Sequence, residues 1–236
     1  MNLSSIRNVF NKLLIIGFLV ISIVAQSFSQ TTNKYGLRVI SDISVYSDQV
    51  LKDSNMNLVN IQKFIPDITV DIKYATEQNV FYTKLYDKPN AFIRLPVVKA
   101  LLKVEKDLNE KGLGLKIYDA YRPYSVTCKM FEMLPDTLYM GLPWYGSKHN
   151  RGIALDLTLI DFKTKKELKM PTPFDALVYP AHPDFRGLSE EAIRNREVLK
   201  ATMHKYGFIV DPMEWWHYNY VSNFQFDILD IPSEFF

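Results

Sequence analysis

Two short segments restrict the possible folds of this chain more than any other feature. Residues 147–156 read Ser-Lys-His-Asn-Arg-Gly-Ile-Ala-Leu-Asp, and residues 214–217 read Glu-Trp-Trp-His. Three protein ligands, one position left open for water and a nearby base are the parts of a catalytic zinc site. The two segments supply two imidazoles, one carboxylate as a ligand and a second carboxylate as a base, in the residues His149, His217, Asp156 and Glu214.

The sequence around Asp156 has the alternation of a half-buried strand. Apolar residues at every second position of 153–159 would face the core, which places Asp156 on the opposite face. Gly152 permits a bend that would bring the His149 imidazole over that same face. A second alternating run, residues 217–221, begins with the other histidine. Two neighbouring strands of one sheet could therefore supply all three ligands.

Each of these residues has a plainer interpretation when it is taken alone. A single Asp on a strand usually belongs to a solvated face, and a single His beside aromatic residues usually packs in a core. The combination H-x6-D with E-x-x-H is more specific, because the chain has only four histidines. His182, in Ala-His-Pro, is an alternative ligand that only its loop context supports. The sequence contains no H-E-x-x-H, G-x-S-x-G or S-x-x-K motif, which argues against other hydrolase mechanisms.

The strings S-x-H-x-x-G-x-A-x-D and E-W-W-H resemble the signature of the D-alanyl-D-alanine metallopeptidases. Over roughly residues 67–232, further stretches resemble the dipeptidase branch of that family: 71–76, 118–123, 170–175 and 195–208. The resemblance implies one Zn²⁺ per chain, held by His149, Asp156 and His217. It also implies that Glu214 takes a proton from the attacking water.

Further residues acquire roles through the same resemblance. Arg122, in Asp-Ala-Tyr-Arg-Pro, matches the arginine that stabilises the developing oxyanion, whereas alone it would be interpreted as a salt bridge or loop anchor. Asp119 would orient this guanidinium or pack locally. Ser147 resembles the contact to the terminal carboxylate of the substrate, with a turn-capping hydroxyl as the alternative. Asp175 would either hold a ligand imidazole in one tautomer or brace a loop.

The implied activity is the hydrolysis of the D-alanyl-D-alanine dipeptide to two D-alanines in cell-wall precursor turnover. A D,D-carboxypeptidase that trims terminal D-Ala from peptidoglycan stem peptides would use the same site in a more open cleft. A non-catalytic peptidoglycan- or zinc-binding module is the contrasting possibility. Val80 and Tyr82 stand where an Asn-Phe pair and a Gly are common in the family, which leaves the side-chain preference open.

The N-terminal residues have the order of a secretory signal peptide. Arg7 and Lys12 precede an apolar run over 13–24, and small residues follow at 25, 27 and 29. The run is shorter than the ~20 residues that span a bilayer. We expect residues 1–29 to be cleaved and the protein to be exported to the periplasm without a membrane span. A retained anchor is the alternative.

The charge balance and the cysteine count of the mature chain narrow its partners. Cleavage removes two of 28 basic residues and none of 26 acidic residues, so the net charge falls from +2 to zero. This balance argues against a nucleic-acid partner. The partner that the family resemblance implies is a small D-amino-acid peptide substrate. The single cysteine, Cys128, rules out a disulfide within the chain and is expected to be a buried, unreactive thiol. The sequence does not indicate an oligomeric state.

The predicted fold is one α+β domain, in which a small, mainly antiparallel sheet carries the zinc site and helices pack against it. Residues 30–62 are weakly patterned and are predicted to form an extended lead-in to a catalytic domain over 63–236. The expected strands are 67–74 and 115–119 besides those of the site, and the expected helices are 95–111, 125–134 and 189–206.

Overall fold

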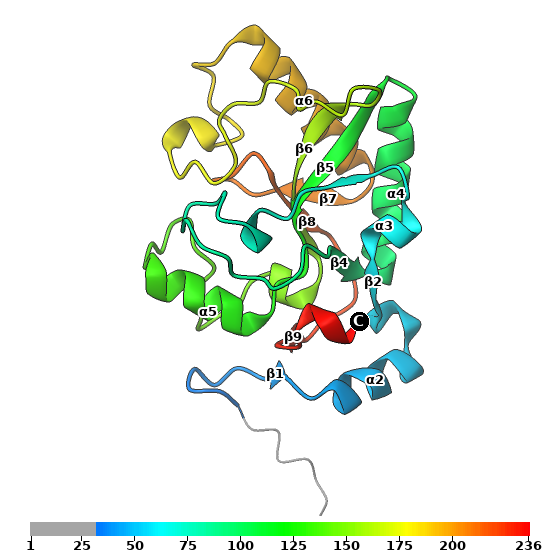
Figure 1. Ribbon diagram of the computed structural model, residues 1–236, viewed down its shortest axis with the longest axis vertical. Helices are drawn as coiled ribbons and strands as arrows, with labels where there is room; N and C mark the ends of the chain where they lie inside the picture. Colours follow the sequence, from blue (N-terminus) through cyan, green and yellow to red (C-terminus); the bar gives the residue numbers. More distant parts are fainter. Residues whose placement is uncertain (1–31) are drawn as a thin grey trace, which may run out of the picture. The chain divides into compact units, whose positions relative to one another are not determined.

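A five-stranded sheet at the centre of the computed structural model carries most of the predicted strands (Figure 1). Its strand order is β3-β5-β6-β8-β7; β3 pairs with β5 in parallel, and the other pairs are antiparallel. The prediction of a mainly antiparallel sheet is therefore confirmed. The strands are β3 (Thr69–Val70), β5 (Leu113–Asp119), β6 (Ala154–Asp161), β7 (Phe208–Val210) and β8 (His217–Tyr220).

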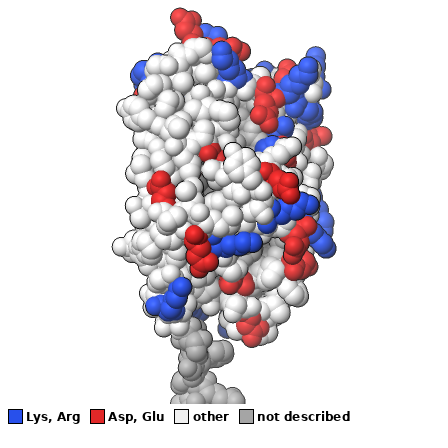
Figure 2. Space-filling model, turned by 60° about the vertical axis from the view of Figure 1, so that its left-hand side comes forward, with Lys and Arg blue, Asp and Glu red and all other residues white. Residues whose placement is uncertain are grey.

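The structure describes residues 32–236, and residues 33–236 form one compact unit. The predicted signal peptide, residues 1–29, lies outside the described residues. Within the described part of the chain, no helix is long and apolar enough to cross a membrane. On the face that Figure 2 shows, side chains of both charges are interspersed, so this face presents no extended field of one sign.

Two helices cover the leucine face of the sheet. α4 (Leu95–Asn109) has a proline in its first turn, and α6 (Glu190–Lys205) is capped by the Ser189 side chain, which accepts from the Ala192 N–H. Both helices share one core with the leucines of β6. In Figure 1, α5 (Tyr124–Met133) lies apart from these two helices, at the lower left of the view. All three helices match the predicted ranges to within two residues.

β6 differs from its prediction in one respect. Leu155, Leu157 and Leu159 face the core as expected, but Asp156 and Thr158 are buried as well. The strand is thus buried on both faces instead of one, because the loops on its polar face cover it. A carboxylate in such a position is desolvated and requires a cationic partner or hydrogen-bond donors.

The strand predicted over 67–74 is much shorter than expected. Only Thr69–Val70 pair with β5, and the chain then enters a 3₁₀ turn, η2 (Lys73–Ala75). The alternating burial persists through Ile72 and Tyr74, which explains the wrong prediction: the period of the side chains was right, but the backbone leaves the sheet. The turn places the Tyr74 hydroxyl where it donates to Asp175 at 2.8 Å.

The extended lead-in predicted over 30–62 is also wrong. This segment contains β1 (Val39–Ile40), α2 (Ile43–Lys52), β2 (Leu58–Asn60) and the first half of α3 (Ile61–Phe64). β2 pairs with β4 (Phe92–Arg94), and β1 pairs with β9 (Ile228–Leu229). The sequence pattern is weak because Tyr46 is the one buried residue of α2, a helix on the rim of a small second core. Residue 63 is therefore not a structural boundary.

One buried acid in α4 makes the stability of the fold depend on pH. Glu105 is 2% exposed, and its Oε2 accepts the Leu115 N–H at 2.9 Å. Burial raises the pKa of this carboxyl to about 7. The folded chain therefore binds more protons than the unfolded chain between pH 4.5 and 7, so the contribution of Glu105 to stability falls as the pH rises through that window.

We expect Glu105→Gln, which keeps an acceptor for Leu115, to match the wild type near pH 4.5 and to exceed it at pH 8 by about 1–3 kcal/mol. Urea unfolding of both proteins across this range measures the difference. Glu110→Gln, one residue beyond the end of the same helix, is the control and should show no such pH-dependent gain. A difference between Glu105→Gln and wild type that does not change with pH would contradict the prediction.

Candidate metal centre

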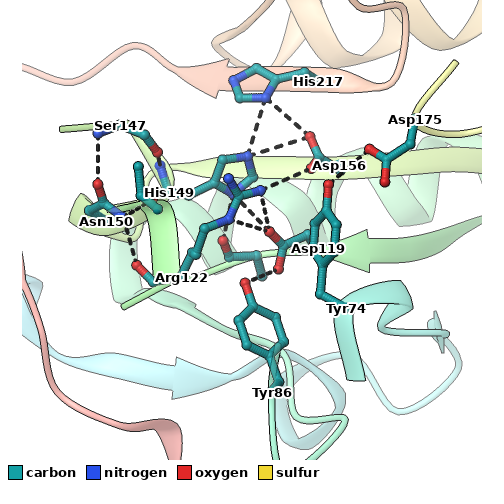
Figure 3. Close-up of polar contacts among 12 residues, drawn as sticks. Tyr74, Tyr86, Asp119, Arg122, Ser147, His149, Asn150, Asp156, Asp175 and His217 are labelled. Carbon is teal, nitrogen blue, oxygen red and sulfur yellow. Dashed lines mark hydrogen bonds and ion pairs between the residues drawn. The ribbon is translucent and has the colours of Figure 1, made fainter. Parts of the chain in front are cut away.

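Two paired strands and one turn deliver the three predicted ligands. In the β6–β8 ladder, Asp156 lies directly opposite His217. His149 begins η3 (His149–Arg151), a 3₁₀ turn that ends at Gly152 with φ of +69° and leads directly into β6. The left-handed conformation of Gly152 is the bend that the sequence indicated, and it folds the turn back over the polar face of the sheet. Figure 3 shows the three side chains converging.

The three side chains approach one another through three specific atoms. His149 Nε2 lies 3.2 Å from His217 Nδ1 and 3.5 Å from Asp156 Oδ1, and His217 Nδ1 lies 3.1 Å from the same oxygen. Among the described residues, these three form the one group of potential metal ligands whose donor atoms lie so close together. His182, the alternative ligand, lies elsewhere and contacts the Tyr139 hydroxyl at 3.2 Å.

Hydrogen bonds on the far side of each imidazole fix its tautomer. His149 Nδ1 lies 2.6 Å from the Ala120 carbonyl oxygen, which can only accept, so Nδ1 carries the proton and Nε2 presents a lone pair. His217 Nε2 lies 3.1 Å from Asn219 Oδ1, so in the neutral imidazole Nδ1 is the acceptor. Burial lowers the pKa of His217, but Asp156 outweighs it and raises the pKa to about 9 when no metal is bound. With both imidazoles neutral, two lone pairs and a carboxylate oxygen face one another, an arrangement that a metal cation between them would satisfy.

The geometry of this cluster fits zinc. Bonds of 2.0–2.1 Å in a tetrahedron separate neighbouring ligand atoms by about 3.3 Å, close to the three observed separations. Asp156 Oδ1 is buried and receives no hydrogen bond from any described residue. Burial raises the pKa of Asp156, but His149 and His217 outweigh it and hold the pKa well below its usual range. The carboxylate therefore stays ionised and ready to bind a metal ion.

Glu214 lies beside this cluster at the wall of a cavity of about 350 Å³. Its Oε2 is 3.7 Å from His217 Nδ1. Burial raises the pKa of Glu214 to about 8; His217 opposes the shift, and the carboxylates of Asp156 and Asp211 add to it. A carboxyl with a pKa near neutrality can both accept and return a proton at physiological pH, as a general acid–base catalyst requires.

Arg122 is buried and points into the same cavity. Its Nε and Nη2 donate to Asp119 Oδ2 at 3.0 and 2.7 Å, and the hydroxyl of Tyr86 donates to the other oxygen of Asp119 at 2.9 Å. The guanidinium carbon lies 5.2 Å from the centre of the Tyr74 ring. Burial lowers the pKa of Arg122, but Asp119 outweighs it and keeps the guanidinium charged. Asp119 thus orients the arginine, which was one of the two alternatives predicted for it.

Ser147 and Asp175 both line the cavity, and the structure shows what each contacts. Ser147 Oγ accepts the His149 N–H at 3.0 Å, which is the turn-capping alternative, and its own hydroxyl proton is not used in that bond. Asp175 accepts from Tyr74 and from the Val80 N–H, so it braces a loop and does not contact a ligand imidazole. The tautomer-fixing role that we considered for Asp175 falls instead to Ala120 and Asn219.

Sequence reasoning missed two supporting residues. Asn150 is fully buried; its amide donates to the Arg122 carbonyl and to Thr127, and its Oδ1 accepts the Ser147 N–H. Its position next to His149 was the only feature of the sequence that could have indicated this supporting role. Tyr86, which holds Asp119, lies in a loop without a pattern, and nothing in the sequence indicated its contact. Both residues position groups that reach the cavity.

Three side chains that could hold a metal ion, with a carboxylate beside them at a cavity, form an arrangement typical of metal-dependent hydrolases. A sequence model of the family described as Peptidase_M15, D-ala-D-ala dipeptidase, matches residues 54–231. The chain belongs to this family of metallopeptidases.

Two relatives are similar to this chain over about two thirds of its length. The D-alanyl-D-alanine dipeptidase of Escherichia coli (strain K12) is 34% identical over 161 residues, which are 68% of this chain and 83% of that protein. The D-alanyl-D-alanine dipeptidase of Enterococcus faecium is 29% identical over 179 residues, 67% of this chain and 88% of that protein.

Solved structures show a more distant likeness. The LdcB LD-carboxypeptidase matches with a TM-score of 0.39 and 19% identity, over 56% of this chain and 60% of that one. VanYB in complex with D-alanine-D-alanine matches with a TM-score of 0.38 and 14% identity, over 56% of this chain and 73% of that one.

Proposed function

We propose that this protein is a zinc-dependent dipeptidase that hydrolyses D-alanyl-D-alanine to two D-alanines in cell-wall precursor turnover. The observation that carries the proposal is the convergence of His149 Nε2, Asp156 Oδ1 and His217 Nδ1 beside Glu214 at one cavity. Membership of the dipeptidase family and the names of the two relatives support D-alanyl-D-alanine as the substrate.

The residues of the cavity divide the chemistry of amide hydrolysis among them. When bound to the three ligands, Zn²⁺ would polarise the scissile carbonyl and lower the pKa of water toward ~7. Glu214 accepts one proton from the attacking water and returns it to the nitrogen of the leaving D-alanine as the C–N bond breaks. Arg122 places positive charge where the carbonyl oxygen becomes negative. Ser147, through its free hydroxyl proton, donates to the terminal carboxylate of the substrate.

We expect Arg122→Lys to lower kcat by about 10²–10³ with little change in KM, because the fork of donors acts mainly on the charge that develops in the transition state. Steady-state kinetics with D-alanyl-D-alanine measure both constants. Arg194→Lys, on the exposed surface of α6, is the control and should behave as wild type. A change confined to KM would assign Arg122 to substrate binding alone.

Product analysis with two substrates tests the proposed function. Purified protein is incubated with D-alanyl-D-alanine and, separately, with an N-acylated stem pentapeptide that ends in D-alanyl-D-alanine, each with and without a chelator. The proposal expects free D-alanine from the dipeptide, much slower release from the pentapeptide and loss of both with the chelator. Preferential release from the pentapeptide would identify a D,D-carboxypeptidase, and binding without turnover would identify a binding module.

Export to the periplasm is a separate part of the proposal. It rests on the basic residues, apolar run and small residues at the N-terminus, which are typical of a signal peptide. Fractionation of cells, followed by N-terminal sequencing of the mature protein, tests it. A chain that starts near residue 30 in the periplasmic fraction is the expected result. An intact N-terminus in the membrane fraction would identify a retained anchor.

A further inference from the structure

A buried arginine outside the metal centre has no anionic partner. Arg94, at the end of β4, is 0% exposed. The arginine ion pairs among the described residues involve Arg38, Arg122, Arg194 and Arg196, and not Arg94. Its Nη2 has no hydrogen-bond partner in that part of the chain. Burying an unpaired charge is costly, so the contacts that the side chain does make require an explanation.

The guanidinium is held between aromatic rings and backbone carbonyls. Its central carbon lies 5.1 Å from the centre of the Phe226 ring and 5.9 Å from that of Tyr46. Nη1 donates to the Met56 carbonyl, and Nε donates to the Arg151 carbonyl at 2.9 Å. Burial lowers the pKa of Arg94 to about 10, so the side chain is still charged at neutral pH. A charged donor strengthens each of these hydrogen bonds to a carbonyl.

Arg94 donates hydrogen bonds to two successive carbonyls of the turn that carries His149, residues 149–152. The Arg94 side chain donates to the Arg151 carbonyl, and the Arg94 backbone N–H donates to the Gly152 carbonyl at 3.0 Å. These carbonyls belong to the last residue of η3 and to the bend that follows it. A Cβ at Gly152 would lie 3.2 Å from Arg94 Cγ, so the turn lies directly against the arginine stem.

The same short strand also holds the segment that supports the other side of the His149 ring. The Phe92 carbonyl accepts the Tyr121 N–H at 2.8 Å. Ala120, the preceding residue, accepts from His149 Nδ1, and the Arg122 N–H reaches the His149 carbonyl at 3.3 Å. β4 therefore fixes the ligand turn and the acceptor of its imidazole relative to each other.

We infer that Arg94 is a positioning residue of the metal centre, which holds the turn of residues 149–152 so that His149 Nε2 stays within ligand distance of Asp156 and His217. This inference rests on the proposed zinc site. The hydrogen bond from Arg94 to the Met56 carbonyl also ties the segment between α2 and β2 to the side chain that holds the ligand turn.

Metal affinity of Arg94 variants tests the inference. Arg94→Met keeps most of the volume and removes the charge and the donors, and Arg94→Lys keeps the charge and one donor group. Ile93→Val, which alters packing in the main core at the neighbouring position of the same strand, whose backbone pairs with β2, is the matched control. For each protein, we would measure the zinc dissociation constant by competition with a chromogenic chelator, the visible spectrum of the Co²⁺-loaded protein and the free energy of unfolding in urea.

We expect Arg94→Met to weaken zinc binding by about 10–100-fold, which is typical of losing a group that orients a ligand, and to change the Co²⁺ spectrum. Arg94→Lys should recover part of the affinity. Ile93→Val should lose stability but keep the wild-type affinity and spectrum. Wild-type affinity and spectrum in a folded Arg94→Met or Arg94→Lys protein would overturn the inference, as would failure of both variants to fold while Ile93→Val folds. A wild-type protein that binds no zinc would instead contradict the proposed function.

Discussion

Glu214→Gln is expected to lower kcat for D-alanyl-D-alanine by about 10²–10⁴-fold while the protein still binds one zinc ion. Glutamine has nearly the same shape as glutamate but cannot accept a proton from water or return it to the leaving amine. The carboxylate is 3.7 Å from His217 Nδ1, beside the ligand cluster, so its loss should leave the three ligand atoms in place. Rates of D-alanine release measure the loss in kcat, and zinc analysis of the same samples measures whether the metal is retained.

Asp211→Asn is the matched control for this variant. Asp211 is a second acid at the wall of the same cavity, and its Oδ1 accepts the Met213 N–H at 2.9 Å. Because Asp211→Asn retains that acceptor and removes only a minor contribution to the raised pKa of Glu214, we expect kcat to fall much less than in Glu214→Gln. If Glu214→Gln and Asp211→Asn kept equal activity, Glu214 could not be the proton carrier.

Asp156→Asn is expected to abolish tight zinc binding and, with it, activity. The substitution removes the one negative charge among the three ligands, so the loss in affinity should exceed the 10–100-fold typical of changes outside the ligand shell. A zinc concentration 100 times the dissociation constant stabilises a wild-type site by about 2.7 kcal/mol. Thermal unfolding with and without zinc should show that gain for wild type and almost none for the variant.

Thr158→Val controls for substitution on the same face of β6. Thr158 lies two residues along the strand, and its hydroxyl is buried without a partner among the described residues. Valine has a similar shape and no polar atom to leave unpaired, so this variant should keep both its stability and its response to zinc. A zinc-dependent gain in Asp156→Asn equal to that of Thr158→Val would remove Asp156 from the ligand set.

The sequence was sufficient to predict the sheet that carries the site, because its signals are local and periodic. The leucines of β6 predict a core face, and the position of Asp156 between them predicts the opposite one. The helices had clear ends, such as Ser189 before α6 and the proline at the start of α4. The combination of H-x6-D with E-x-x-H then indicated three candidate ligands, of which Asp156 and His217 lie on adjacent strands and His149 lies in the turn before β6.

What the sequence could not predict depends on contacts between distant residues. Tyr86 reaches Asp119 across 33 positions, and Arg94 reaches Arg151 across 57. Neither contact leaves a periodic trace. The prediction of an extended lead-in was wrong for a related reason. α2 buries only Tyr46, so its apolar face is too narrow to give a clear helical pattern in the sequence. Alternating burial likewise could not distinguish a continued strand from the 3₁₀ turn at Tyr74, because both bury the same side chains.

Anomalous diffraction at the zinc absorption edge, from crystals of the protein grown with one equivalent of zinc, tests the central claim most directly. The account predicts one strong peak, about 2.0–2.2 Å from His149 Nε2, Asp156 Oδ1 and His217 Nδ1, with Glu214 beside it but not bound. A peak at His182 or at any other group, with none between these three atoms, would contradict it.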